Sequence, residues 1–319
     1  MKWVDDLRRD ATRTAVRGGL RLAGRLGVER TRSFGNAVGR FAASVPALRG
    51  RLEGNLRAAG MDHGDETVRA YFRRFGFWIG HSLNVYAQGI ERSGLTDQME
   101  LDPDTVRHLD EAVARGKGVV LASPHMFLHE MVAGLIHRRH PVTAVVRESK
   151  DPAWEQIKVR WYNTALGLET LYRPRRSSVA REIAAMLRVL RAGQVLAITP
   201  DVLTSPRTGV PVRLLARTVS LSPGMILLAM RAGAALVTGR YHWFRDPSAP
   251  SGERLRVVVY EPLELAKTSD LEAALRDGLQ RWCVLFEAQL HGSPGDWLFW
   301  LDKGWTKVLR RPAEPGDGE

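Results

Sequence analysis

The stretch GVVLASPHMFLHEMVAGLIHRRH, residues 118–140, decides the predicted fold class. It opens with a short apolar run between a glycine and a Ser-Pro pair, a pattern typical of a buried strand. Apolar residues then recur with the spacing of one helical face, and basic residues follow where a helix C-terminus favours them. His125 is therefore expected where a strand passes into a helix. In open α/β sheets, ligands bind at that edge.

Helical and apolar patterns alternate along the chain from residue 104 onward. The predicted strands are residues 118–123, 142–146, 169–172, 194–199, 235–241 and 255–260. The predicted helices are residues 66–88, 104–115, 127–140, 152–166, 178–191, 223–231 and 270–290. Because strands that alternate with helices form parallel sheets, the predicted fold is α/β. It is an αβα layered domain with a mostly parallel central sheet, preceded by N-terminal helices.

The composition limits the class of protein. The chain has 319 residues and a mass of 35.6 kDa, which is enough for one large core. Its single cysteine, Cys283, excludes an internal disulfide framework and a multi-cysteine metal site. The formal charge of +12 indicates an anionic partner: nucleic acid, a membrane surface, an acidic protein or a phosphorylated substrate. No segment approaches the roughly 18 apolar residues of a membrane span, and no signal-peptide core is present. We expect the protein inside the cell.

The first thirty residues form a basic amphipathic pattern, with arginines on one side of a predicted helix and apolar residues on the other. The arginines are Arg9, Arg13, Arg17, Arg21 and Arg25. Such a helix is typical of segments that lie on an anionic bilayer; packing of its apolar side on the domain is the alternative. The predicted regions are a membrane-associating helical region at 1–50, a catalytic domain at 51–309 and a disordered tail at 310–319.

His125 and Glu130 are the predicted catalytic residues. Glu130 falls in the first turn of the expected helix, where the helix amides favour an ionised carboxylate. A carboxylate folded back against an imidazole holds its tautomer and raises its basicity. Two alternatives remain at this point. One is a metal-dependent hydrolase that uses His125, His129 and Glu130, and the other is a basic nucleic-acid-binding protein, although no recognisable binding module is present.

Further segments follow in a characteristic order. They are NLRAAG from Asn55, TAVVRESKDP with Arg147, AGQVLAITPD with Asp201, and SPGDWLFWLDKGW near the C-terminus. Together with the His-x4-Glu spacing of His125 and Glu130, this order resembles the lipid A biosynthesis acyltransferase family, the lauroyl and myristoyl transferases of the lysophospholipid acyltransferase superfamily. The resemblance covers residues 55–305, most of the chain.

The resemblance implies an acyltransferase that moves a fatty acyl group, not an amino-acyl group, from an acyl carrier protein or coenzyme A thioester to a hydroxyl of a lipid or glycolipid. His125 would act as general base with Glu130 as its partner. The residues expected to bind substrate are Arg147, Lys150, Arg160 and Asp201. No metal, no cofactor beyond the thioester and no nucleic-acid partner are implied. The expected place is the cytoplasmic face of the inner membrane, as a peripheral protein on anionic lipid without a transmembrane helix.

The chain departs from the family pattern at several positions. Phe127, Leu128 and His129 stand between the histidine and the glutamate, where the family usually has small or amide residues. Val202 follows Asp201 in place of glutamine, and Asp302 replaces a histidine or tyrosine. These residues are expected to line or border the cleft. They motivate the hypothesis that the acceptor differs from lipid A precursors.

Overall fold

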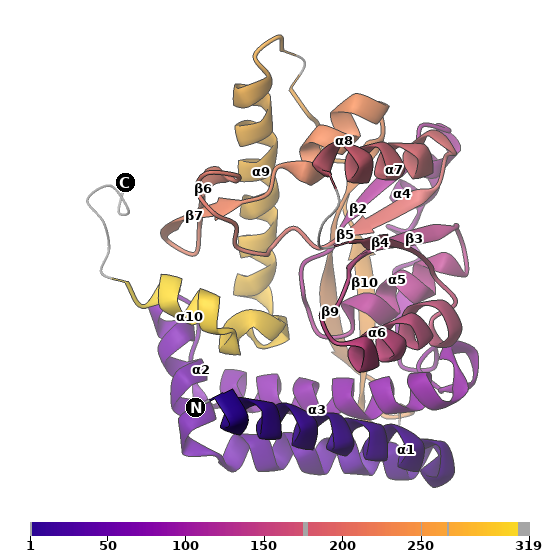
Figure 1. Ribbon diagram of the computed structural model, residues 1–319, viewed down its shortest axis with the longest axis vertical. Coiled ribbons are helices and arrows are strands. Elements are labelled where there is room, and N and C mark those ends of the chain that lie inside the picture. The colour runs from indigo at the N-terminus through magenta and orange to yellow at the C-terminus, as the bar shows by residue number, and fades with distance from the viewer. Residues whose placement is uncertain (1, 175–177, 250, 267, 312–319) are drawn as a thin grey trace.

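The computed structural model describes residues 2–174, 178–249, 251–266 and 268–311 (Figure 1). Side chains are described from residue 18 onward within these ranges, except at residues 21 and 22. Most of the predicted disordered tail, residues 312–319, therefore lies outside the described residues. The side chains of Arg9, Arg13, Arg17 and Arg21, which carry the predicted basic face, also lie outside the description.

A five-stranded, all-parallel sheet forms the centre of the molecule, with strand order β4-β3-β5-β2-β8. The strands are β2 (Val119–Ala122), β3 (Val142–Arg147), β4 (Glu169–Arg173), β5 (Val195–Ile198) and β8 (Ala235–Val237). Their sequences are rich in valine, leucine, isoleucine and alanine because both faces of the sheet are covered by helices. The predicted αβα fold with a parallel sheet is confirmed.

The helices that follow the strands cover opposite faces of this sheet (Figure 1). On one face lie α5 (His129–His137), α6 (Pro152–Val159) and the π-helix η2 (Arg160–Ala165). On the other lie α7 (Val179–Arg191) and α8 (Gly224–Ala232). The chain therefore leaves the neighbouring strands β2 and β5 toward opposite faces. The carboxyl ends of these two strands form a topological switch point, where open α/β sheets bind ligands.

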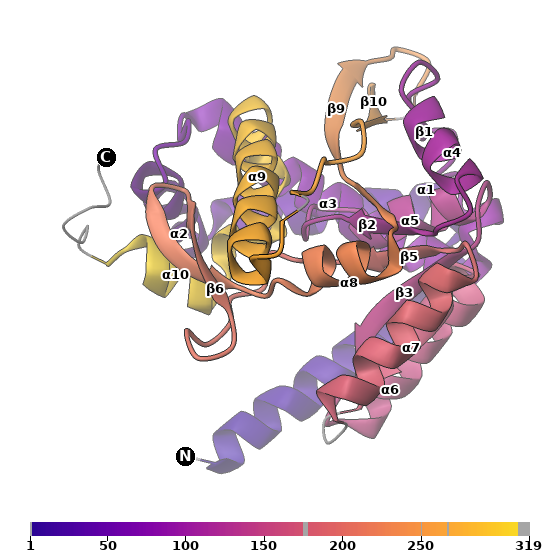
Figure 2. The same cartoon turned by 90° about the horizontal axis from the view of Figure 1, so that it is seen from above.

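The three N-terminal helices are α1 (Lys2–Ser44), α2 (Pro46–Ala58) and α3 (Asp65–Gln88). Figure 1 shows α1 and α3 below the sheet and α2 next to α10. Gly27, at φ 73° and ψ 171°, breaks α1 into two helical parts that turn sharply on one another (Figures 1 and 2). The second part packs closely on α3 through glycines: a Cβ atom at Gly35 would lie 2.4 Å from the Gly76 carbonyl oxygen. The predicted N-terminal helices are present, and the predicted region boundary at residue 50 lies inside α2.

Other elements surround this framework. They are the 3-10 helix η1 (Ile90–Arg92), α4 (Arg107–Ala114), a second sheet of β1 (Met99–Leu101), β10 (Glu253–Val259) and β9 (Gly239–Arg245), and a hairpin of β6 (Val210–Leu214) and β7 (Arg217–Leu221). Figure 2 shows α9 (Leu271–Gly292) beside that hairpin. The chain then forms η3 (Pro294–Asp296), η4 (Leu298–Leu301) and α10 (Lys303–Leu309). One predicted strand, residues 235–241, is in fact two strands in different sheets.

Candidate active site

His125 and Asp201 meet at the switch point between β2 and β5. In the parallel register Ala122 of β2 lies opposite Ile198 of β5, and each site residue stands three positions after its strand end. The imidazole Nδ1 of His125 lies 2.7 Å from Asp201 Oδ1, and the His125 backbone N–H donates to Asp201 Oδ2 at 2.9 Å. The carboxylate thus fixes both the backbone and the ring of the histidine.

The Asp201 carboxylate is fully buried, with an exposed fraction of 0%. Burial alone raises the pKa of Asp201, but the charge of His125 and the hydrogen bonds from His125 and Trp297 outweigh burial and hold that pKa below the ordinary aspartate value. An ionised Asp201 is an acceptor only, so His125 Nδ1 carries the proton that it receives. When the ring is neutral, the lone pair is therefore on the other ring nitrogen, Nε2, which can accept a proton.

The C-terminal segment builds the wall behind this pair. Phe299 stacks on the His125 ring, with centroids 4.3 Å apart and an interplanar angle of 23°. Trp297 donates its indole N–H to Asp201 Oδ2 at 2.9 Å, and Trp305 donates to the Asp201 carbonyl oxygen at 3.1 Å. The Leu298 N–H donates to the His125 carbonyl oxygen at 2.9 Å. The side chain of His125 remains 20% exposed, so a substrate can reach it from the open side.

Glu130 has other partners than the sequence suggests. It lies in the first turn of α5, as expected, but its carboxylate accepts hydrogen bonds from Trp161 Nε1 at 3.0 Å and from the Tyr162 hydroxyl. Burial and the Glu130 charge raise the pKa of Tyr162, which keeps the hydroxyl protonated as a donor. The prediction that Glu130 holds the His125 ring is therefore wrong. A spacing of five residues places the carboxylate toward η2, and Asp201 makes the contact with His125.

His129 stands beside the pair, although the sequence pointed to it only as a metal ligand. Its ring centroid lies 5.0 Å from that of His125, and its Nδ1 lies 2.9 Å from the Met126 carbonyl oxygen. Burial lowers the pKa of His129 below the ordinary histidine value, against the opposing charge of Glu130. His129 is thus a neutral ring with its Nε2 available as an acceptor. Leu128 precedes it at φ 69°, a strained conformation for leucine that places the start of α5.

The three side chains of the alternative metal site do not converge on one point. His125, His129 and Glu130 each point to a separate partner in the protein, as described above. Among residues 2–174, 178–249, 251–266 and 268–311, no group of three or more histidine, cysteine, aspartate or glutamate side chains has the arrangement of a metal site.

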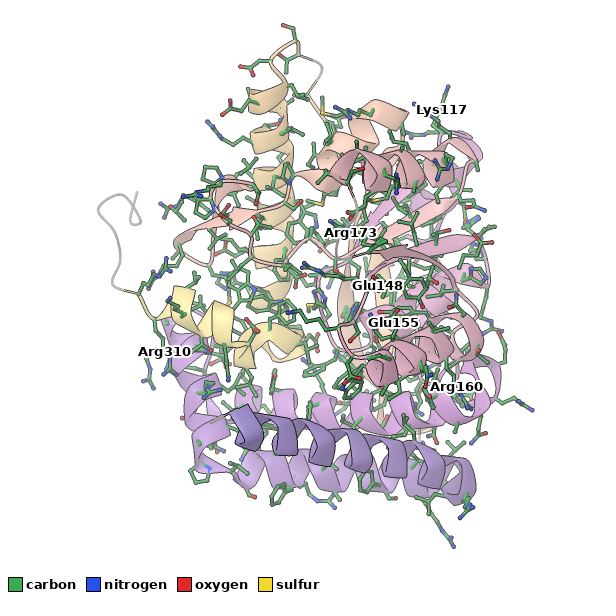
Figure 3. All side chains as sticks on the ribbon, in the orientation of Figure 1. Lys117, Glu148, Glu155, Arg160, Arg173 and Arg310 are labelled. Carbon is green, nitrogen blue, oxygen red and sulfur yellow. The ribbon has the colours of Figure 1, made fainter. Side chains whose placement is uncertain are left out.

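The structure distributes the four expected substrate residues over three places. Asp201 is fully buried, and its carboxylate contacts His125. Arg147 ends β3 on the same sheet edge and is exposed; Lys150 follows it and is also exposed. None of the ion pairs among the described residues involves either cation. Arg160 instead lies near the N-terminal helices, with its guanidinium 4.8 Å from the centre of the Tyr86 ring (Figure 3).

A further cation on this edge was not expected from the sequence. Arg173 ends β4 and is the register partner of Arg147, which places two arginines side by side. Arg173 forms an ion pair with Glu182 at 2.6 Å. Figure 3 labels Arg173 near the middle of the molecule. The position of this arginine after a predicted strand was the available signal, since β4 and β3 are neighbours.

Two of the departures from the family pattern do not border the site. Phe127 and Leu128 are each 1% exposed, and Phe127 packs against Tyr71 with ring centroids 5.1 Å apart. The expectation that they line the cleft is wrong, because the turn before α5 directs both side chains into the core. Val202, next to Asp201, is exposed, and Asp302 caps α10 by accepting the Trp305 N–H at 2.9 Å.

Comparisons with known proteins cover almost the whole chain. The family described as bacterial lipid A biosynthesis acyltransferase matches residues 5–307. Two relatives from Mycobacterium tuberculosis strains, each named phosphatidylinositol mannoside acyltransferase, are 29% identical over 192 residues. The alignment spans 60% of this chain and 55% of each relative, so it covers little more than half of their length.

Proposed function

Because this chain belongs to the bacterial lipid A biosynthesis acyltransferase family, we propose that it transfers a fatty acyl group from a thioester to a hydroxyl of a lipid or glycolipid. The observation that carries the reaction is the contact of 2.7 Å between His125 Nδ1 and the buried Asp201 carboxylate. In the neutral ring this contact leaves the lone pair on His125 Nε2, and the ring is partly exposed. The expected acyltransferase class is confirmed at the level of the family.

The reaction requires one base and no protein nucleophile. His125 Nε2 removes the proton from the acceptor hydroxyl while the oxygen forms its bond to the thioester carbon. The imidazolium that results is stabilised by the ionised Asp201. When the carbon–sulfur bond breaks, the imidazolium returns this proton to the departing thiolate. The products are the new ester and the free thiol.

The proposed donor is acyl carrier protein or coenzyme A, with acyl carrier protein ranked first by family resemblance. Both donors are anionic, and the chain has a formal charge of +12. Arg147, the last residue of β3, and Lys150, which follows that strand, are both exposed at the carboxyl end of the sheet. Arginine forks match phosphate geometry, so these two cations support phosphate binding next to the reaction centre.

The proposed acceptor is a glycosylated phospholipid. The two mycobacterial relatives are named for acyl transfer to phosphatidylinositol mannoside, and this similarity favours such an acceptor over a lipid A precursor. A sugar offers several neighbouring hydroxyl groups, and His129 places a second neutral imidazole acceptor 5.0 Å from the His125 ring. We therefore assign His129 to positioning the acceptor through a hydroxyl beside the one that reacts.

We further propose that the protein acts at the cytoplasmic face of the inner membrane as a peripheral protein. The second part of α1 exposes Phe34 at 49% and Phe41 at 71%. They are seven residues apart, or about two helical turns, and so share one face of the helix. Arg30 and Arg40 are exposed on the same part. This combination suits insertion at an anionic lipid surface. Among the described helices, none is long and apolar enough to cross a membrane.

Sedimentation with phosphatidylglycerol vesicles tests the membrane proposal. The double variant Phe34→Glu and Phe41→Glu should remain in the supernatant, because two carboxylates replace the inserting rings. Val284→Glu is the matched control: it removes an exposed apolar residue from α9, at 59% exposure, away from α1. Equal sedimentation of the double variant and the wild type would contradict this role of α1.

Release of free thiol from purified palmitoyl-CoA and palmitoyl-acyl carrier protein tests the reaction and its donor. Thiol should appear when an acceptor lipid is added, and His125→Ala should lose about 10³-fold or more in rate because its base is missing. Equal rates for the wild type and a folded His125→Ala variant would remove the mechanism. No geometry among the described residues favours the metal-dependent hydrolase or nucleic-acid-binding alternatives, and acyl transfer is the one function proposed.

A further inference from the structure

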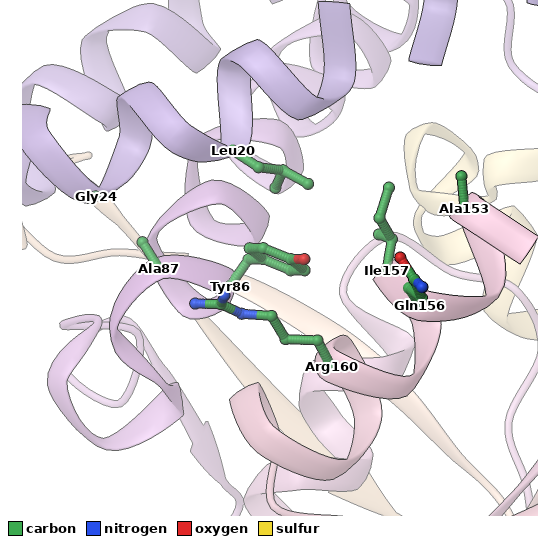
Figure 4. Close-up of a pocket in the computed structure, with 8 residues that line it drawn as sticks. All are labelled: Leu20, Gly24, Tyr86, Ala87, Ala153, Gln156, Ile157 and Arg160. Carbon is green, nitrogen blue, oxygen red and sulfur yellow. The ribbon is translucent and has the colours of Figure 1, made fainter. Parts of the chain in front are cut away.

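A cavity of about 640 Å³ opens between the first part of α1, the end of α3 and helix α6 (Figure 4). Its lining residues are Leu20, Gly24, Tyr86, Ala87, Ala153, Gln156, Ile157 and Arg160. We propose that this cavity binds one anionic phospholipid as a ligand that does not react. None of the residues described for the acyl-transfer centre lines this cavity, and the inference stands independently of the proposed function.

The walls of the cavity suit an acyl chain. Leu20 comes from α1, Ala87 from α3, and Ala153 and Ile157 from α6, so apolar side chains from three helices line one space. Figure 4 shows the Tyr86 ring and Ile157 on opposite sides of it. Its volume lies in the range of typical small-molecule sites, about 300–1,000 Å³. The apolar part of the lining suits a flexible hydrocarbon chain, and Tyr86, Gln156 and Arg160 supply a polar part.

Arg160 gives the cavity a place for an anionic head group. Its guanidinium lies 4.8 Å from the centre of the Tyr86 ring, which holds it by a cation–π contact. Among the described residues, no carboxylate forms an ion pair with Arg160. Arg160 and Gln156 also line a second cavity of about 820 Å³, whose other lining residues come from α6 and η2. A phosphate at Arg160 would therefore sit at the junction of two spaces, with donors toward its oxygens.

The lining of the cavity includes none of the residues of the reaction centre. Arg160 faces the N-terminal helices, whereas the next two residues, Trp161 and Tyr162, donate hydrogen bonds to Glu130. No hydrogen bond or ring contact among the described residues links a lining residue of the cavity to His125 or Asp201. The proposed lipid is a ligand and not the acceptor of the acyl group. Because α1 supplies one wall, the lipid would instead hold the first part of this helix against α3 and α6.

Native mass spectrometry of the full chain with monomeric palmitoyl-lysophosphatidylglycerol tests the inference. The wild type should bind one lipid. Ile157→Trp, which places a bulkier side chain in the cavity, should weaken this complex. Arg160→Met removes the charge and keeps the length of the side chain; it should weaken phosphate binding about tenfold and leave binding of monopalmitoylglycerol unchanged, because that lipid has no phosphate. Arg188→Met is the matched control, an exposed arginine at the end of α7 that should bind as the wild type does.

Three outcomes would overturn the inference. The first is that Ile157→Trp binds the lipid as well as the wild type does. The second is that Arg160→Met lowers the affinity for both lipids equally. The third is that the bound lysophospholipid becomes diacylated when a thioester donor is added. The last result would identify it as an acceptor. His125→Ala separates this inference from the proposed function, because it should lose acyl transfer and retain the lipid complex.

Discussion

Replacing Asp201 by asparagine tests the buried carboxylate most sharply, because the change keeps the shape of the side chain and removes its charge. The carboxylate accepts two hydrogen bonds from His125, at 2.9 and 2.7 Å, and one from Trp297 at 2.9 Å. An asparagine has one oxygen and one NH₂ group in place of the two carboxylate oxygens. Its NH₂ group must therefore face a position where Asp201 accepts a hydrogen bond. The His125 ring then favours the tautomer with Nε2 protonated, which cannot act as a base. In a serine-protease triad the equivalent change lowers kcat by about 10⁴.

We therefore expect Asp201→Asn to lower kcat by about 10³–10⁴, equivalent to about 4–5.5 kcal/mol in the activation free energy. KM should change much less, because the Asp201 side chain is fully buried. The assay is steady-state thiol release, with urea unfolding to show that the variant is folded. Asp302→Asn is the control, since Asp302 caps α10 without touching His125 and asparagine caps equally well. A kcat for Asp201→Asn within tenfold of the wild type would refute this reasoning.

Three further predictions concern the stability of the fold. Glu130→Gln should cost about 1–3 kcal/mol in urea unfolding, because its NH₂ group would face a donor from η2; an unchanged midpoint would speak against these hydrogen bonds. Burial and Arg32 lower the pKa of His81 to about 3. The unfolded chain therefore binds a proton at His81 below about pH 6.5 that the folded chain does not. The free energy of unfolding should fall by about 2 kcal/mol between pH 7 and pH 5. His81→Gln should reduce this loss, and an equal loss in the variant would exclude His81 as its source. Asn55 is buried, accepts a hydrogen bond from Arg310 and donates hydrogen bonds to two groups near the C-terminus. Asn55→Ala should therefore lower the free energy of unfolding by about 2–4 kcal/mol, measured by thermal unfolding. A loss below 1 kcal/mol would contradict this role.

The sequence predicted the central sheet well because its strands are short apolar runs bounded by clear turns. It also placed His125 and Asp201 correctly at two strand ends. It did not show that these residues meet, since β5 follows β2 only after two intervening strands in the chain. Neighbour relations in a parallel sheet depend on crossover order, and local patterns do not encode that order. Glu130, the nearer carboxylate in sequence, was therefore assigned a contact that Asp201 makes.

The hairpin of β6 and β7 was missed for a different reason. Its turn residues, Leu215 and Ala216, have φ values of 57° and 53°. Two-residue hairpin turns of this kind usually carry asparagine or glycine at these positions, and neither residue gives that signal. Leu215 is completely buried, so its burial offsets the conformational strain. Leu128 also has a positive φ, and the side chains of Phe127 and Leu128 are buried in the core. The spacing of residues in the sequence did not indicate this.

The most direct test of the central claim is mass spectrometry of lipids from a host that expresses the wild-type protein, compared with hosts that express folded His125→Ala or Asp201→Asn variants. The account predicts that the wild type alone adds the mass of a fatty acyl group to a lipid, and that this lipid carries a sugar. Supplying a phosphatidylinositol mannoside to the host extract ensures that an acceptor of the proposed class is present. An acylated product of equal abundance in all three samples would contradict the role of the His125 and Asp201 pair, and no product with any supplied acceptor would contradict the proposed reaction.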